Sequence, residues 1–399
     1  MTALCFTLGL LALLGHSMFW VGVYNKLHAT GLPHGLIKCL NLLIYVLLVA
    51  GLVAAGWLAK EASPAECLGF LTNISRPVWW ASGLPAVIYL LLVWSTAVIG
   101  VPKWLQQRLR RPPLALLSND TQPFDVVREL GQPLAGPGLG RVFAALPGNE
   151  LFRLHIHEKV IVPPRLPAAL DGLSIAHLSD LHFTGYVARP YFDFVVDRTN
   201  AFDADLVVIT GDILDKWRCL DWLPATLGRL RARAGVYFIL GNHDLRVRDV
   251  ATLRRTLVEC GLIDLGGHAM TIEIRGEKIL LAGNELPWFG PAPPPESLAA
   301  PAAGDRVFRI LLSHSPDQLP WARRHDFDLM LAGHTHGGQI CFPGIGPVVS
   351  PSRFGVRYAS GLFDEPPTIL HVSRGISGQH PLRWNCPPEL TKLLLRHSS

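Results

Sequence analysis

The chain has 399 residues, of which 49% are hydrophobic and 17% are charged. This composition is too apolar for an ordinary soluble enzyme. The net charge of +5 is spread along the chain without a basic, aromatic-rich stripe, so we expect no nucleic-acid partner. The seven cysteines are widely spaced and odd in number, which argues against a disulfide framework.

The apolar excess lies at the N-terminal end. Three apolar runs, at about 2–24, 40–58 and 78–101, are each long enough to cross a bilayer, which takes ~20 residues. No Lys or Arg precedes the first run, and no convincing cleavage site separates it from the second, so a signal peptide is the weaker interpretation. The sequence predicts a membrane anchor of about three transmembrane helices over residues 1–103.

The charges between these runs predict an orientation. The loop after the first run carries Lys26 and Lys38 and no acidic residue. A basic cluster follows the third run, at Lys103, Arg108, Arg110 and Arg111. Cytoplasmic loops carry an excess of Lys and Arg, so we expect an integral membrane protein whose C-terminal domain is cytoplasmic. In a bacterium this membrane would be the inner one.

The rest of the chain divides into a linker and a folded domain. Residues 104–150 are rich in Pro and Gly and predict a tether, with a short helix near 125–130. From residue 151, apolar β-rich runs alternate with helical segments at 190–202, 220–233 and 250–260. The apolar runs lie at 173–178, 206–210, 236–240, 279–282, 310–312 and 329–332. This alternation predicts an α/β domain over 151–399 with sheets buried on both faces. A Pro/Ala-rich insertion at 292–304 is expected to be a surface loop.

Five short blocks follow apolar runs of this domain and carry Asp, His and Asn. They are Asp180-Leu181-His182, Gly211-Asp212 with Asp215, Gly241-Asn242-His243-Asp244, Ser313-His314, and Gly333-His334-Thr335-His336-Gly337-Gly338-Gln339. In α/β folds, sites form beyond the carboxyl ends of the strands, so we expect the five blocks to converge. Mixed Asp, His and Asn ligands without thiolate suit divalent metal ions.

These blocks, with Ser373-Arg374-Gly375-Ile376 and the ending Pro381-Leu382-Arg383-Trp384-Asn385-Cys386-Pro387-Pro388-Glu389, resemble the calcineurin-like metallophosphoesterase superfamily. The resemblance covers roughly residues 151–396. The C-terminal motifs look like those of the membrane-associated bacterial YkuE/YaeI-like branch, which includes enzymes similar to UDP-2,3-diacylglucosamine pyrophosphatase. The implied fold is an α/β double β-sandwich flanked by helices, here preceded by a transmembrane helical segment.

The resemblance also implies a role for each residue. The metal ligands would be Asp180, His182 and His336 for the first ion, Asn242, His314 and His334 for the second, and Asp212 as the bridge. His243 would sit beside the scissile phosphate as acid or charge stabiliser, and Asp215 would orient it. The cofactors would be two divalent ions, with manganese the first expectation and iron, zinc, magnesium or cobalt the alternatives.

The expected function is metal-dependent hydrolysis of a phosphodiester or pyrophosphate bond at the cytoplasmic membrane face. A membrane anchor favours a lipid-linked substrate such as UDP-2,3-diacylglucosamine. The alternatives are an anchored phosphodiesterase for soluble substrates and a non-catalytic membrane scaffold, and the oligomeric state stays open.

Two further features bear on the substrate. Phosphoprotein phosphatases carry Asp-Arg-Gly where this chain has Asp215-Lys216-Trp217, which argues against protein dephosphorylation. Four arginines are candidates to bind a second phosphate group, and the alternative for each is a surface or strand-packing role: Arg353, Arg357, Arg374 and Arg383.

Overall fold

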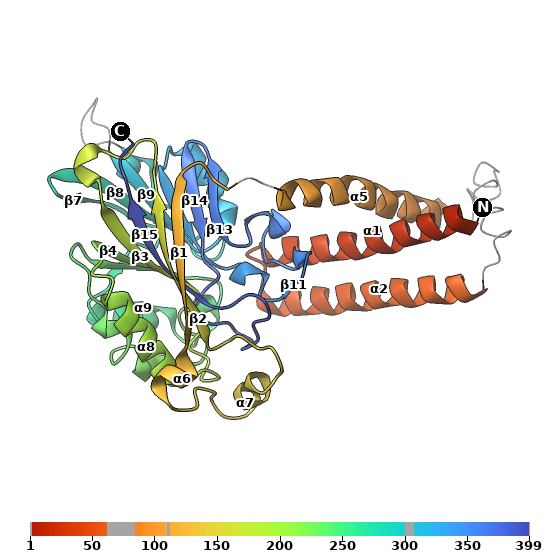
Figure 1. Ribbon diagram of the computed structural model, residues 1–399, viewed down its shortest axis with the longest axis horizontal. Helices are drawn as coiled ribbons and strands as arrows, with labels where there is room; N and C mark the ends of the chain where they lie inside the picture. The colour runs from red at the N-terminus through yellow and green to blue at the C-terminus, as the bar shows by residue number, and fades with distance from the viewer. Residues whose placement is uncertain (1, 62–83, 110–111, 300–306, 399) are drawn as a thin grey trace. The chain divides into compact units, whose positions relative to one another are not determined.

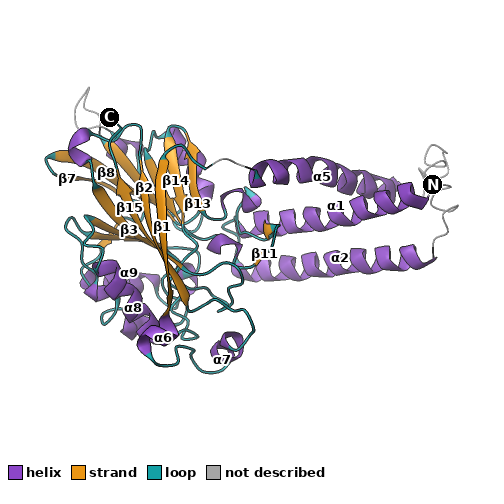
Figure 2. Ribbon diagram, in the orientation of Figure 1, coloured by secondary structure: helices purple, strands orange, loops and turns teal. Residues whose placement is uncertain are grey.

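The computed structural model describes residues 2–61, 84–109, 112–299 and 307–398 (Figure 1). The chain forms two compact units, Met1–Arg111 and Pro112–Ser399. The first is helical, and the second holds the β-sheets together with their covering helices (Figure 2).

The helical unit consists of α1 (Thr2–His28), α2 (His34–Glu61) and α5 (Leu84–Arg108). Each contains a stretch that is long and apolar enough to cross a membrane, at Phe6–His28, His34–Ala54 and Ile88–Arg108. The three expected apolar helices are therefore confirmed, with altered bounds, and the start of the third expected run, 78–83, lies outside the described residues. His16, in the middle of α1, lies with Nε2 3.0 Å from the Leu48 carbonyl oxygen of α2.

The second unit contains a seven-stranded and a six-stranded mixed sheet. The first has the order β1-β2-β15-β3-β4-β5-β6, and the second has the order β13-β14-β10-β9-β8-β7. The strands of the first are β1 (Leu116–Asp125), β2 (Arg153–Ile161), β15 (Glu389–Leu395), β3 (Leu173–Leu178), β4 (Leu206–Thr210), β5 (Val236–Ile239) and β6 (Ile263–Asp264). Those of the second are β13 (Gly361–Glu365), β14 (Thr368–Val372), β10 (Leu329–Ala332), β9 (Phe308–Ser313), β8 (Glu277–Asn284) and β7 (Ala269–Ile274).

Alternating side chains on the central strands build the layers of this unit. On β4, Leu206 and Val208 join Ile310 and Leu312 of β9 in the core between the two sheets. Their neighbours Val207 and Ile209 face the opposite way, toward α8 (Arg189–Asn200) and α9 (Val250–Glu259). The outer face of the six-stranded sheet packs against α10 (Leu319–Arg324). Because both faces are covered, strands such as β3 and β4 are buried along their whole length, which confirms the expected α/β double sandwich.

The segment expected to be a tether differs from the prediction. Residues 116–125 form β1, which pairs antiparallel with β2 from Leu116 beside Ile161 to Asp125 beside Arg153. Its residues are mostly exposed because β1 lies at the edge of the sheet, so it lacks the apolar pattern that marks the inner strands. The expected short helix is present as α6 (Val126–Leu130), and α7 (Leu139–Ala144) follows it.

Two further segments hold short 3-10 turns. The segment 220–233 was expected to be helical, but it holds only the end of one 3-10 turn, η2 (Trp217–Trp222), and a second, η3 (Leu227–Arg229). Pro224 and Gly228 break this segment, which explains the difference. The insertion at 292–304 holds the short turn η5 (Pro295–Leu298), and its last residues lie outside the described part of the chain.

Candidate metal centre

The five sequence blocks meet at one edge of the two sheets. Three of them follow the neighbouring parallel strands β3, β4 and β5, and two follow the neighbouring parallel strands β9 and β10. Each strand is buried apart from the half-buried Arg309 of β9, and its polar block begins within three residues of its last residue. The sandwich therefore brings ligand-type side chains from distant parts of the sequence to one place, as expected at the carboxyl ends of parallel strands.

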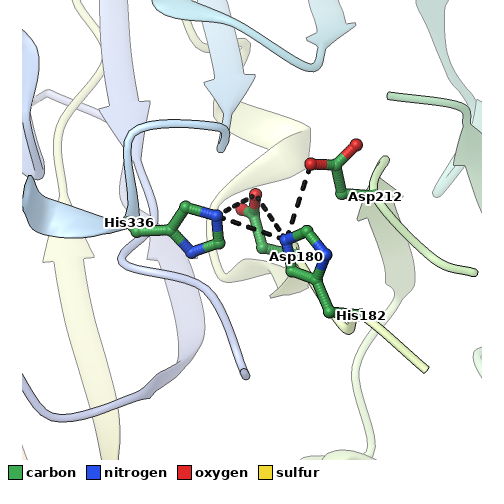
Figure 3. A group of neighbouring side chains, drawn as sticks. All are labelled: Asp180, His182, Asp212 and His336. Atoms are coloured by element: carbon green, nitrogen blue, oxygen red, sulfur yellow. Dashed lines mark hydrogen bonds and ion pairs between the residues drawn. The ribbon is translucent and has the colours of Figure 1, made fainter. Parts of the chain in front are cut away.

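The first group of side chains consists of Asp180, His182, Asp212 and His336 (Figure 3). One ligand atom from each lies within 4.8 Å of those of the others. The Nε2 atoms of His182 and His336 are 3.2 Å apart, and His336 Nε2 lies 3.5 Å from an oxygen of Asp180. Figure 3 shows the two rings turned toward each other with both carboxylates beside them. This set fits the first predicted metal site.

The second group consists of Asp212, His314 and His334. Nε2 of His314 lies 3.2 Å from an oxygen of Asp212 and 3.1 Å from Oδ1 of Asn242. Asp212 therefore belongs to both groups, which is the position that a bridging ligand needs. All seven residues expected to hold metal lie in or directly beside these two groups.

Hydrogen bonds fix the direction in which two of the histidine rings present their free nitrogen. His314 Nδ1 lies 2.7 Å from the carbonyl oxygen of Thr210 and can only donate to it. Nε2 is therefore the ring atom that faces Asp212 and Asn242. His182 is held in the same way, because its Nδ1 donates to Asp215 at 2.7 Å. Such outer contacts are what orient metal-binding histidines in proteins.

The negative charge of the cluster favours bound cations. Burial alone would lower the pKa of His182, but the carboxylates of Asp215, Asp212 and Asp180 raise it to about 9. His314 is also buried, and Asp212 with Asp180 raises its pKa to about 9. The field that stabilises a proton on these rings would stabilise a divalent ion in its place. The donor set, free of thiolates, fits such ions.

The backbone around the cluster is strained. Five of the expected ligands have a left-handed conformation that is uncommon for residues other than glycine: Asp180 (φ 53°), His182 (φ 48°), Asp212 (φ 54°), His334 (φ 70°) and His336 (φ 52°). Left-handed backbone of this kind costs on the order of 1 kcal/mol or more per residue and gathers at functional sites. The gathering of five such residues here supports a functional role for the cluster.

Two side chains that the sequence did not single out lie at the cluster. A guanidinium nitrogen of Arg246 lies 3.4 Å from Nε2 of His243. The ring of Trp288 covers the second group, with its centroid 4.8 Å from that of His334 and 5.4 Å from that of His314. Arg246 lies three positions after His243, a spacing that could have suggested it, whereas Trp288 comes from the loop after β8 and carries no local signal.

The four arginines considered as phosphate ligands all have internal partners. Arg383 is fully buried and donates to the carbonyl oxygens of His336 and Arg374, at 3.0 and 2.8 Å. Arg374 binds Glu389 at 2.8 Å, Arg357 binds Glu365 at 2.8 Å, and Arg353 donates to the carbonyl oxygen of Asp317. These contacts support the packing interpretation. Arg383 holds the backbone of the His336 loop instead.

Comparison with known proteins agrees with the site. The model of the calcineurin-like phosphoesterase family matches residues 173–338. YkuE of Bacillus subtilis, named an uncharacterized metallophosphoesterase, is 31% identical over 247 residues, covering 61% of this chain and 85% of that protein. Phosphodiesterase YaeI of Escherichia coli is 31% identical, covering 55% and 81%. A transmembrane protein with metallophosphoesterase domain from Danio rerio is 30% identical, covering 97% and 88%.

The sandwich fold and the Asp/His cluster at its strand ends define a metal-dependent phosphoesterase. The chain belongs to the calcineurin-like metallophosphoesterase family. It is a hydrolase of a family that uses divalent metals, and three apolar helices indicate a membrane protein.

Proposed function

We propose that this protein is a two-metal phosphodiesterase that cleaves a phosphodiester or pyrophosphate bond of a lipid-linked substrate at the cytoplasmic face of a membrane. The observation that carries the proposal is the pair of ligand groups sharing Asp212. Two adjacent cations stabilise both the attacking and the leaving oxygen of an in-line displacement, whereas a single ion does not.

The ligand roles follow from the two groups. Asp180, His182 and His336 would hold one ion, and Asn242, His314 and His334 the other, with Asp212 between them. When bound, the ions supply Lewis acidity toward phosphoryl oxygens and acidify water at neutral pH.

The remaining steps belong to protein side chains. Asp215 accepts from Nδ1 of His243 at 2.5 Å, so the ring is held with Nε2 available to carry a proton toward the leaving oxygen. The backbone N–H of His243 donates to Asp212 at 2.8 Å, which ties this ring to the proposed bridge. The guanidinium of Arg246 provides positive charge beside the same ring, where negative charge builds on the phosphoryl oxygens during the transfer.

The membrane location rests on the helical unit. We assign residues 1–103 to an anchor and place the catalytic domain in the cytoplasm, because the basic residues gather in the last turns of α5 and directly after it. We also assign residues 151–399 to the catalytic domain. The domain further includes β1, which lies within the segment 104–150. An anchored enzyme and an amphiphilic substrate share one surface, which favours a substrate such as UDP-2,3-diacylglucosamine.

The test is hydrolysis of UDP-2,3-diacylglucosamine by full-length protein in detergent with Mn²⁺, beside bis-p-nitrophenyl phosphate. Asp212→Ala is the control for two-metal chemistry. Release of UMP from the lipid nucleotide, lost in the variant, is the expected result. Cleavage of the generic diester alone would reject this lipid and favour a soluble substrate. No cleavage of either by metal-loaded protein would overturn the enzymatic proposal in favour of a scaffold.

A further inference from the structure

An exposed apolar ridge lies beside the metal centre. We define the ridge as Phe342, Ile345, Val348, Val349 and Trp384, whose exposed fractions run from 37% to 47%. Four of these residues come from the hairpin of β11 (Cys341–Phe342) and β12 (Gly346–Pro347) and the two residues that follow it. Residues 337–352 contain no Asp, Glu, Lys, Arg or His. Large apolar side chains gathered on a surface mark an interaction site.

The ridge is one surface because its parts contact each other. The rings of Phe342 and Trp384 have centroids 6.1 Å apart, and the backbone N–H of Cys341 donates to the Trp384 carbonyl oxygen at 2.9 Å. A side chain added at Gly148 would lie 3.3 Å from the indole nitrogen of Trp384. The exposed Leu146 precedes Gly148 by two residues in the chain.

The ridge is joined directly to the loop that carries His334 and His336. A side chain at Gly338, two residues after His336, would overlap with Pro347 and approach the Val349 carbonyl oxygen to 3.0 Å. The thiol of Cys341 donates to the carbonyl oxygen of Gly337 at 3.4 Å. The hairpin thus packs on the turn that follows the metal ligands, and a molecule that covers the ridge lies at the edge of the site.

We propose that this ridge enters the surface of the bilayer that holds the protein's own helices, and so delivers lipid-linked phosphoesters to the metal centre. This inference rests on the membrane location in the proposed function. Only residues 109–115 separate α5 from β1, and seven residues span at most about 25 Å. The catalytic unit therefore stays within reach of the membrane at all times.

The chemistry of the ridge suits a lipid surface. Aliphatic and aromatic side chains on a hairpin without charge can enter the acyl boundary, while an indole ring prefers the headgroup level. A second copy of the chain or a protein partner would also cover apolar surface. The short tether favours the membrane, because it holds the ridge at a high effective concentration relative to the bilayer whether or not a partner protein is present.

The test uses full-length protein in phosphatidylcholine and phosphatidylglycerol vesicles that contain a lipid with a diazirine in its acyl chain. After illumination, mass spectrometry measures carbene labelling of each peptide in the catalytic unit. Peptides with residues 341–349 and 384 should be labelled severalfold above the peptide with Val258, an α9 residue of similar exposure (50%). The double variant Ile345→Asp, Val349→Asp should lose most of this labelling, whereas Val258→Asp should leave it unchanged.

Each outcome bears on the ridge without requiring turnover. Labelling of the ridge no stronger than that of the Val258 peptide overturns the inference. Weak labelling that recovers when the protein is diluted into excess lipid points to a second copy and overturns it as well. Labelling as expected, in a protein that does not cleave UDP-2,3-diacylglucosamine, supports the ridge and rejects that substrate. Thermal unfolding in detergent checks that the double variant is folded.

Discussion

Oδ1 of Asp215 lies 2.5 Å from Nδ1 of His243. The second oxygen of the same carboxylate lies 2.7 Å from Nδ1 of His182. One side chain therefore orients both the ring proposed to hold a proton at the phosphate and a ring proposed to bind metal. The histidines hold the pKa of Asp215 well below its usual range in spite of burial, so the carboxylate is charged at neutral pH.

Asp215→Asn should reduce kcat for bis-p-nitrophenyl phosphate by about 10–100-fold, the usual cost of removing a residue that orients metal ligands. Asparagine keeps the shape of the side chain but loses the charge and one of the two acceptors. Metal content, measured by mass spectrometry, should fall too because His182 is no longer held. Asp221→Asn changes an exposed aspartate in the following segment and should have no effect. Wild-type kinetics in Asp215→Asn would contradict the orienting role.

Gly333→Ala should disturb the first metal group by steric overlap alone. A Cβ at Gly333 would overlap with Ser179 and with a carboxylate oxygen of Asp180. Because Asp180 is fully buried, it can move only by leaving the cluster, and we expect a loss of metal affinity of at least 10-fold. Gly228→Ala is the matched control, since its Cβ would meet nothing nearer than 3.6 Å. Isothermal titration with Mn²⁺ measures both, and equal affinities would contradict the geometry of the site.

A buried charged network behind the site should make stability depend on pH. Lys159 donates to Glu389 at 2.6 Å and to Nε2 of His371 at 2.9 Å. Burial, with the charge of Lys159, lowers the pKa of His371 from 6.5 to about 4. The unfolded chain therefore binds more protons than the folded protein between these values, and the free energy of unfolding falls as pH drops through this window. For His371 the loss is roughly 3 kcal/mol.

Unfolding temperatures of the detergent-solubilised protein between pH 7.5 and 4.5 measure this dependence. His371→Gln should flatten the slope, and its stability at pH 7.5 should be lower because two hydrogen bonds of the ring change. His268→Gln, at an exposed position of the same protein, should keep the wild-type slope. An unchanged slope in His371→Gln would show that His371 does not carry the effect.

The positions of the five polar blocks were predictable from sequence because the strands before them are apolar runs. β3 and β4 are buried along their whole length, so their apolar runs mark where each strand ends. Asp180 and Asp212 each follow two residues after such an end. The family comparison then supports the fold that these runs predict. The geometry around each residue, such as the double contact of Asp215, depends on elements far apart in the chain and had no local signal.

The sequence analysis did not predict β1, at the edge of the seven-stranded sheet, or β15, the last strand of the chain, and the two omissions have different reasons. β1 contains Asn119, Asp120 and Gln122 in a mostly exposed pattern, so it resembles a loop in sequence. β15 inserts between β2 and β3, where the charge of Glu389 is offset by Lys159 and Arg374. Only the tertiary structure shows that this charge is paired and buried.

Removal of metal should lower the thermal stability of the catalytic unit. Asp180 and Asp212 are both buried, and Asp212 adds to the effect of burial in raising the pKa of Asp180, so their mutual repulsion is unfavourable without cations. A ligand at 100 times its Kd stabilises by about 2.7 kcal/mol, which corresponds to roughly 5–10 °C for a unit of this size. We expect EDTA to lower the unfolding temperature by about this amount and Mn²⁺ to restore it.

Two variants separate metal binding from general destabilisation. Asp212→Asn should unfold at the same temperature with Mn²⁺ and with EDTA, because the proposed bridge is lost. Asp317→Asn removes another buried aspartate, which accepts from Ser352 at 2.6 Å and belongs to neither ligand group. It should unfold earlier than wild type in both conditions and keep the full difference between them, because the metal ligands are intact. A difference in Asp212→Asn as large as in wild type would rule out Asp212 as the ligand on which metal-linked stability depends.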